Sequence, residues 1–270
     1  MKNYIIILVL HVFTFSKAEI KVKVYTEKTA EGFSIFVDNN EHCPVSIKLD
    51  FVTENLMIEG GNNKTYLVNS LKKKQLITKL NIISKTKKYS YSYNFLTNYG
   101  DVNLVNYDKN FEYNLPFNRS EQYKITQGYN GKLSHKNENA LDFLMPIGTE
   151  IHAMREGVVI DVVDHNSLNC AQEECKKYNN YITVYHPDGT FASYVHIKNK
   201  GSVVKVGEKI IENQLIGYSG NVGWSTGPHL HIVIFKMKMN NRETLKTLFK
   251  IDDGKQSIYL QDKMTYNKNY

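Results

Sequence analysis

Apolar residues recur at every second position through the first third of the chain, and this alternation constrains the fold most strongly. Side chains of a β-strand point alternately to opposite faces, so an alternating segment presents one apolar face to a core. Turn-forming clusters such as Asp38-Asn39-Asn40 separate the alternating segments. Examples of the alternation are Ile20/Val22/Val24, Phe33/Ile35/Val37, Val45/Ile47/Leu49 and Tyr89/Tyr91/Tyr93/Phe95. About seven short strands without a helical period predict a β-sandwich-like domain over residues 19–105. Its tyrosine stripe is expected to pack inward.

The rest of the chain is predicted to be mostly β as well. Residues 106–122 are polar and turn-rich, which is typical of a linker. Strand-like segments punctuated by Gly and Pro return at residue 123, and they predict a second domain over residues 123–240. Residues 241–270 are expected to form a C-terminal extension, with a short helix near 243–249 and a strand near 257–260. The sequence therefore predicts an all-β protein.

The N-terminus reads as a signal peptide over residues 1–18. Lys2 precedes an apolar run over residues 4–15, and Ser16 and Ala18 supply small residues at the −3 and −1 positions. The apolar run is too short to remain in a bilayer as a spanning helix. We therefore expect a protein exported to the periplasm or the cell exterior, associated with the cell wall and without stable membrane insertion.

Composition excludes some classes of protein. With 41% hydrophobic and 23% charged residues, the chain is globular rather than disordered. Its net charge of +7 is compatible with attraction to an anionic cell wall, although solvated lysines on loops explain the charge as well. No nucleic-acid-binding motif accompanies the charge, so no nucleic-acid partner is predicted.

Three cysteines suggest one local crosslink. Cys170 and Cys175 bracket Ala-Gln-Glu-Glu in a polar loop between two strand-like segments. In an oxidising compartment they are able to form a disulfide that closes a small loop. A second zinc site is the competing interpretation, but no histidine pair lies nearby. Cys43 is then expected to be a buried free thiol.

The segment His229-Leu-His231 carries the strongest functional signal. Two histidines two residues apart on an extended segment project from the same face. A loop of small residues, 223–228, runs directly into the pair. Such an arrangement delivers one imidazole to a metal and another to the chemistry beside it. An isolated His-x-His is a weak signal, so the argument depends on further ligands elsewhere in the chain.

Candidate partners for this pair occur upstream. His135 precedes Asp142 by seven residues, and Leu141 and Phe143 are expected to face a core while the Asp142 carboxylate faces the opposite, accessible side. His196 ends another apolar alternating segment. Two imidazoles and one carboxylate, with a fourth position open to water, are typical of a catalytic zinc rather than a structural one.

The order of these residues and the sequences around them resemble the LytM/lysostaphin-type zinc metallopeptidases. The resemblance covers roughly residues 125–236 and includes 142–151, 156–159, 179–184, 204–210 and 216–223, followed by the His-x-His tail. It implies a compact antiparallel β domain with an open groove over the metal. It also implies that the zinc ligands are His135, Asp142 and His231, and that the two catalytic histidines outside the ligand set are His196 and His229.

One spacing departs from the pattern of many family members. They place the first histidine four residues before the aspartate, whereas seven residues separate His135 from Asp142. Glu138 occupies the four-residue position and is a rival ligand. Longer gaps after a Ser-His pair do occur in similar members, so we expect His135 to be the ligand.

The resemblance implies an exported zinc endopeptidase that hydrolyses peptide crosslinks in bacterial peptidoglycan through a zinc-activated water. The alternative is a catalytically silent cell-wall-binding or hydrolase-activating protein on the same fold. Neither the oligomeric state nor the peptide bond that is cut is predicted.

Overall fold

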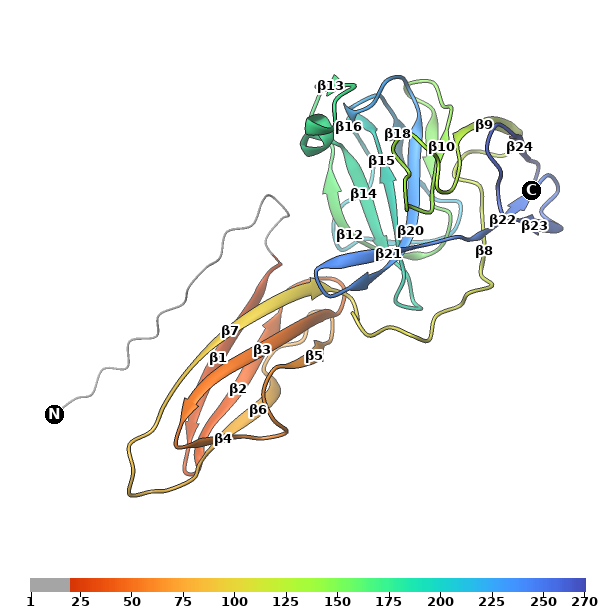
Figure 1. Cartoon of the computed structure of the whole chain (residues 1–270). Coiled ribbons are helices and arrows are strands. Elements are labelled where there is room, and N and C mark those ends of the chain that lie inside the picture. The colour runs from red at the N-terminus through yellow and green to blue at the C-terminus, as the bar shows by residue number, and fades with distance from the viewer. Residues whose placement is uncertain (1–19) are drawn as a thin grey trace. The chain divides into compact units, whose positions relative to one another are not determined.

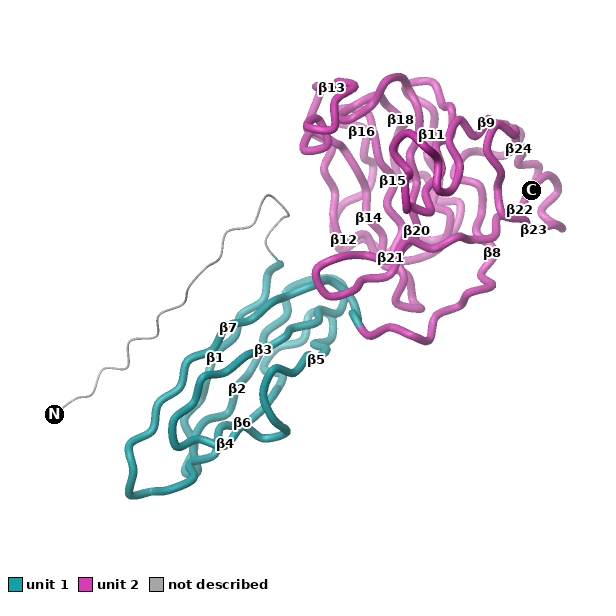
Figure 2. The backbone as a smooth tube through the Cα atoms, viewed as in Figure 1, with its two compact units in different colours: residues 1–102 teal, residues 103–270 magenta. Residues whose placement is uncertain are grey.

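The computed structural model describes residues 20–270, which fall into two compact units, one ending at Val102 and the other spanning Asn103–Tyr270 (Figure 2). The signal peptide predicted for residues 1–18 lies outside the described residues. The regular structure within residues 20–270 is β, apart from the short 3₁₀ helix η1 (Glu173–Tyr178). The prediction of an all-β chain is confirmed. No helix in the described part of the chain is long and apolar enough to cross a membrane.

The first unit consists of two antiparallel sheets (Figure 1). One sheet has the strand order β1-β2-β6-β4 and the other the order β5-β3-β7. The strands are β1 (Val22–Thr29), β2 (Gly32–Asn39), β3 (Val45–Glu54), β4 (Leu56–Ile58), β5 (Lys64–Val68), β6 (Gln75–Ile82) and β7 (Ser90–Tyr99).

Side chains from both sheets of the first unit share one core. Ile35 of β2 and Ile47 of β3 are fully buried in it, and each contributes roughly 1.5–3 kcal/mol by leaving water. Tyr91 of β7 lies 4.8 Å from the ring of Phe33, measured between ring centroids. The tyrosine stripe of β7 therefore packs against this core, as the alternation predicts.

The second unit is built around one large sheet in the order β17-β12-β14-β15-β20-β10-β9-β24, with β21 also paired to β20. Smaller sheets have the orders β11-β18-β16, β13-β19 and β23-β22-β8. The strands are β8 (Glu112–Tyr113), β9 (Glu121–Gln127), β10 (Ala140–Phe143), β11 (Glu150–His152), β12 (Gly157–Val163), β13 (Asn169–Cys170), β14 (Tyr181–Tyr185), β15 (Phe191–Val195), β16 (Ile197–Ser202), β17 (Lys209–Ile210), β18 (Leu215–Ser219), β19 (Gly223–Trp224), β20 (Leu230–Lys238), β21 (Asn241–Leu245), β22 (Leu248–Ile251), β23 (Gln256–Ile258) and β24 (Thr265–Lys268).

Strand register in the large sheet aligns a row of polar side chains. Asp142 of β10 lies directly opposite His231 of β20 on one side and opposite Gln127 of β9 on the other. Directly opposed residues of antiparallel strands project from the same face. The neighbours Leu141 and Phe143 are buried in the core on the other face. The alternation of β10 therefore separates the polar row from the core.

The segment 106–122 is not a linker, in contrast to the sequence-based prediction. It belongs to the second unit, and its Leu115 and Phe117 are fully buried in that unit's core. The backbone carbonyl groups of both residues accept hydrogen bonds from the Lys268 ammonium, at 3.0 and 2.8 Å. The prediction failed because the apolar positions are few, and the C-terminal strand that covers them is distant in sequence.

The predicted helix near 243–249 is also wrong. This segment forms β21 and the beginning of β22, and Leu245 of β21 lies opposite Ile234 of β20. Pairing with an existing sheet satisfies the backbone groups of the segment, and this tertiary contact overrides its local helix propensity. The strand expected near 257–260 corresponds to β23.

Candidate metal centre

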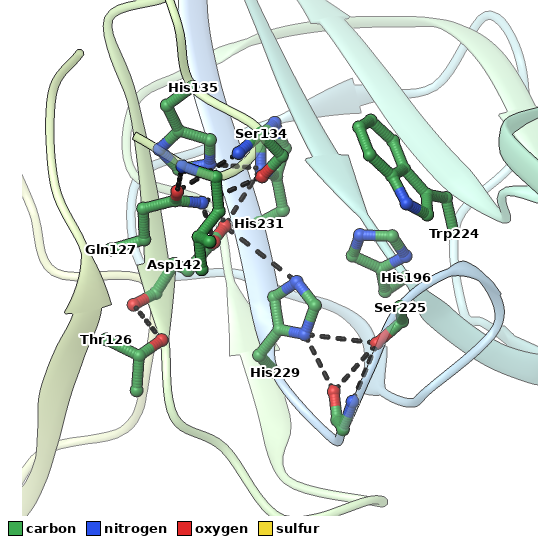
Figure 3. Close-up of polar contacts among 12 residues, drawn as sticks. Thr126, Gln127, Ser134, His135, Asp142, His196, Trp224, Ser225, His229 and His231 are labelled. Carbon is green, nitrogen blue, oxygen red and sulfur yellow. Dashed lines mark hydrogen bonds and ion pairs between the residues drawn. The ribbon is translucent and has the colours of Figure 1, made fainter. Parts of the chain in front are cut away.

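Three side chains of the second unit converge on one point. Oδ1 of Asp142 lies 3.2 Å from Nε2 of His135 and 2.9 Å from Nδ1 of His231. The two histidine nitrogens are 3.1 Å apart (Figure 3). These residues form a cluster of potential metal-ligand atoms within 4.8 Å of one another. The side chain of His135 is fully buried, whereas that of His231 retains 19% exposure, so the cluster is in contact with solvent on one side.

His135 reaches the cluster because the chain turns sharply after it. The Glu138 amide donates to the His135 carbonyl at 2.9 Å, and Asn137 adopts a left-handed conformation with φ of 61°. This turn lets His135 lie beside Asp142 although seven residues, rather than four, separate them in the sequence. The Nδ1–H of His135 donates to the Gly128 carbonyl at 3.0 Å, which leaves the Nε2 lone pair directed at Asp142 and His231.

The geometry and chemistry of the cluster fit a tetrahedrally bound divalent metal. Bonds of about 2.0–2.1 Å to a central zinc place the ligand atoms of a tetrahedron about 3.3–3.4 Å apart. The separations of 2.9–3.2 Å are close to that edge length. In addition, the His135 lone pair faces a carboxylate oxygen, an arrangement that is repulsive unless a proton or a cation lies between the two atoms. His135, Asp142 and His231 are therefore suited to hold a metal.

The electrostatics of the cluster keep the aspartate ionised. Burial raises the pKa of Asp142, but its contacts with His135, His231 and His229 outweigh burial and hold that pKa well below its usual value. Burial lowers the pKa of His231, which favours the neutral imidazole that metal binding requires. The side chain of Asp142 is only 9% exposed, so it is less accessible than the sequence predicted.

Gln127 supports this cluster from the neighbouring strand and was not identified from the sequence. Its Nε2 donates to Oδ2 of Asp142 at 3.0 Å and to Oγ of Ser134 at 2.7 Å. Its Oε1 accepts from the amides of Leu133 and Ser134, at 3.0 and 3.1 Å. One buried amide thus orients the carboxylate and also holds the loop that leads to His135. Only the β9–β10 register reveals it, because an isolated glutamine carries no signal in the sequence.

The two histidines expected outside the ligand set lie together beside the cluster. The ring centroids of His196 and His229 are 4.4 Å apart, and Nε2 of His229 is 3.8 Å from Oδ1 of Asp142 (Figure 3). Each ring is oriented by a backbone carbonyl that accepts from its Nδ1–H. His196 donates to Val222 at 2.7 Å and His229 donates to Gly227 at 2.8 Å.

His196 is held in an unfavourable backbone conformation. Its φ is 65°, in the left-handed region that costs a residue with a side chain about 1–2 kcal/mol. Hydrogen bonds from its amide to the Asn180 carbonyl, at 2.8 Å, and from its ring to Val222 hold it there. Burial lowers the pKa of His196 to about 3, so the ring is neutral near pH 7. Strain of this kind is common at functional sites.

The rival ligand Glu138 does not join the cluster. Its carboxylate pairs with the guanidinium of Arg242 at 3.2 Å, and the side chain is partly exposed. Of the two candidates for the first ligand position, the structure therefore brings only His135 to Asp142 and His231.

The cysteines follow one of the two interpretations of the sequence. Cys170 and Cys175 form a disulfide. Cys43 is free and buried, and burial raises the pKa of its thiol to about 12.

Residues 136–244 match the model of peptidase family M23. An uncharacterized metalloprotease of Buchnera aphidicola is 30% identical over 235 residues, which are 82% of this chain and 58% of that protein. The peptidoglycan DD-endopeptidase ShyA of Vibrio cholerae is 37% identical over 93 residues, which are 34% of this chain and 19% of the relative. The chain therefore spans about half or less of the length of these relatives.

Solved structures are also similar in part. The catalytic domain of lysostaphin from Staphylococcus simulans is 24% identical with a TM-score of 0.34, over 46% of this chain and 88% of that one. A zinc-containing peptidase from Vibrio cholerae is 19% identical with a TM-score of 0.39, over 78% of this chain and 54% of that one.

Proposed function

We propose that the chain, whose residues 136–244 match the model of peptidase family M23, is an exported zinc endopeptidase that hydrolyses peptide crosslinks of bacterial peptidoglycan. The observation that carries this proposal is the convergence of His135, Asp142 and His231, with ligand atoms 2.9–3.2 Å apart, beside the paired rings of His196 and His229.

In this proposal His135, Asp142 and His231 hold the zinc. When bound, the metal would supply Lewis acidity and lower the pKa of a water molecule towards about 7. Gln127 holds Oδ2 of Asp142, so the other oxygen, Oδ1, is presented to the ligand set. His231 and Asp142 come from paired strands of one sheet, which fixes their separation without help from loops.

His196 and His229 then act on the peptide rather than on the metal. Each donates its Nδ1–H to a carbonyl, so Nε2 is the ring nitrogen that each presents to the substrate. A free Nε2 accepts a proton as the attack on the amide proceeds, and the resulting imidazolium donates a hydrogen bond to the developing oxyanion or a proton to the leaving amine. The 4.4 Å between the ring centroids allows both histidines to contact one substrate group.

The substrate is inferred from the relatives. ShyA is named a peptidoglycan DD-endopeptidase, and lysostaphin is 32% identical over 105 residues of this chain. A bacterial wall substrate is also consistent with the predicted signal peptide. An open groove over the metal cluster, which would accept a crosslinked peptide, remains a prediction.

The proposal is tested by incubating the purified protein, loaded with zinc, with isolated sacculi and with defined crosslinked muropeptides. Mass spectrometry of the products is expected to show cleavage within the peptide stems or crosslinks, and a chelator is expected to stop it. Binding to sacculi without any cleavage, by a protein that elemental analysis shows to contain zinc, would contradict the proposal and support the non-catalytic alternative.

A further inference from the structure

A short disulfide-closed segment runs alongside the loop that precedes the His-x-His pair. Strand β13 pairs in parallel with β19, so that Cys170 lies opposite Trp224. The Leu168 carbonyl accepts from the Gly223 amide at 2.8 Å, and the Cys170 carbonyl accepts from the Ser225 amide at 3.1 Å. The backbone of one disulfide cysteine thus bonds directly to the loop.

Side chains strengthen this connection at Trp224. The indole Nε1–H donates to the Ala171 carbonyl, inside the disulfide loop, at 3.0 Å. The Trp224 amide donates to Oδ1 of Asn179, the residue that ends η1, at 2.9 Å. Gly223 has φ of 88°, and a Cβ at this position would lie 2.0 Å from that same Oδ1. The two segments are therefore too close for any residue except glycine at position 223.

The other side of the same loop orients both histidines outside the ligand set. The Val222 carbonyl accepts from the His196 ring at 2.7 Å, and the Gly227 carbonyl accepts from the His229 ring at 2.8 Å. Oγ of Ser225 bonds to the Gly227 carbonyl at 2.8 Å and lies 3.3 Å from Nδ1 of His229. Residues 222–227 therefore connect the disulfide segment with the two rings.

The metal cluster is supported differently. Asp142 and His231 lie on paired strands of the large sheet, and Gln127 on the next strand holds the carboxylate and the His135 loop. None of these supporting contacts involves the segment 168–179. A change in that segment is thus expected to reach the two rings and leave the ligand set in place.

We propose that the segment 168–179, closed by the Cys170–Cys175 disulfide, is a brace that positions His196 and His229 through the loop 222–227. Two-electron reduction of the disulfide to two thiols, by an external thiol or phosphine reductant, releases the segment, and the loop carbonyls that orient the two rings then lose their fixed positions. Turnover by this chain is thereby coupled to the oxidation state of the two cysteines. This coupling rests on the proposed peptidase function, whereas the mechanical link between disulfide and loop does not.

Trp224 provides a direct probe of the link because it is the single tryptophan in the sequence. The zinc-loaded protein is compared with its Cys170→Ser/Cys175→Ser variant and with wild-type protein treated with a phosphine reductant. Both are expected to show red-shifted Trp224 emission and stronger quenching by acrylamide, because the indole loses its partner at Ala171. Glu174→Ala, an exposed change between the cysteines that keeps the disulfide, is the matched control and is expected to match wild type.

Zinc content and steady-state kinetics on a muropeptide complete the test. Opening the disulfide is expected to leave zinc stoichiometry unchanged and to lower kcat by roughly 10- to 100-fold, since a displacement of about 1 Å costs this much. KM is expected to change much less than kcat. Reductant is expected to have no further effect on the double serine variant, which separates the disulfide from Cys43.

Three results would overturn the brace. They are unchanged Trp224 emission after the disulfide is opened, unchanged kcat when the emission has shifted, and loss of zinc together with activity. If the wild-type protein cleaves no muropeptide, the proposed peptidase function fails. The emission measurement still decides whether the disulfide holds the loop.

Discussion

Replacing Gln127 with Met is expected to weaken zinc binding while the protein stays folded. Methionine has a similar length and no polar donor, so it fills the space without orienting Asp142. The variant loses the bond from Nε2 to Oδ2 of Asp142, at 3.0 Å, and the two bonds that Oε1 accepts from Leu133 and Ser134. The Asp142 carboxylate becomes free to rotate, and the loop that carries His135 loses its support.

The expected loss of zinc affinity in Gln127→Met is estimated from these contacts in two ways. A hydrogen bond to a charged group stabilises by about 1.5–3 kcal/mol. Loss of a residue that orients a metal ligand typically lowers metal affinity about 10- to 100-fold, which corresponds to about 1.4–2.7 kcal/mol. The two estimates agree. Because the His135 loop is released at the same time, we expect a loss near the upper end, about 100-fold.

The affinity is measured near neutral pH by competition between the protein and a chromogenic zinc chelator. Thr126→Val is the matched control on the same strand, since Thr126 is exposed and its hydroxyl donates at 3.3 Å to the backbone carbonyl of Asp142 rather than to the carboxylate. Circular dichroism of the metal-free variants shows whether each is folded. A folded Gln127→Met protein that binds zinc as tightly as Thr126→Val would refute the assignment of Gln127 as the residue that orients the carboxylate.

Three further predictions concern the histidines. His231→Ala is expected to abolish zinc binding, as measured by elemental analysis. His196→Ala is expected to keep its zinc and to lower turnover by about 100-fold or more. Full activity of His196→Ala would show that the role of His196 is misassigned. His135→Ala is expected to lower metal content and Glu138→Ala is not, and the reverse pattern would contradict the ligand set. His186 is fully buried and burial lowers its pKa to about 4, so only the unfolded state takes up its proton as pH falls below about 6.5. The free energy of unfolding, measured in urea, is therefore expected to fall by up to about 3 kcal/mol between roughly pH 6.5 and 4. If this free energy depends equally on pH in the wild type and in His186→Phe, the explanation is wrong.

The sequence predicts the ligand cluster because strand periodicity carries most of its geometry. Alternation places Asp142 on the face opposite Leu141 and Phe143, and the same rule puts His229 and His231 on one face. The seven-residue gap was harder to interpret, because a spacing along the chain does not show where it turns. The left-handed Asn137 and the bond from Glu138 to His135 close the gap, and these are properties of the folded loop.

Features that depend on pairing between distant segments were not predictable. Leu115 and Phe117, in a polar stretch, join a core built from distant segments, and Lys268, some 150 residues later, donates hydrogen bonds to their carbonyl groups. Gln127 acquires its role from its register with Asp142, and a single sequence carries no record of that register. Local propensity also gave the wrong prediction of a helix near 243–249, because pairing of β21 with β20 determines the structure there.

The two parts of the site rest on different kinds of support, and this difference bears on how the protein responds to change. Asp142 and His231 are fixed by the ladder of a central sheet, and their opening requires disruption of β10 and β20. His196 and His229 are oriented by carbonyl groups of one loop, and loops open locally at much lower free energy than core strands do. Perturbations too weak to unfold the whole protein are therefore expected to displace the rings of His196 and His229 first. A protein that has lost turnover but still holds its metal is the expected first product of heating, mild denaturant or reduction. Metal loss should follow when the loop that carries His135, which Gln127 holds against β9, or the sheet itself opens.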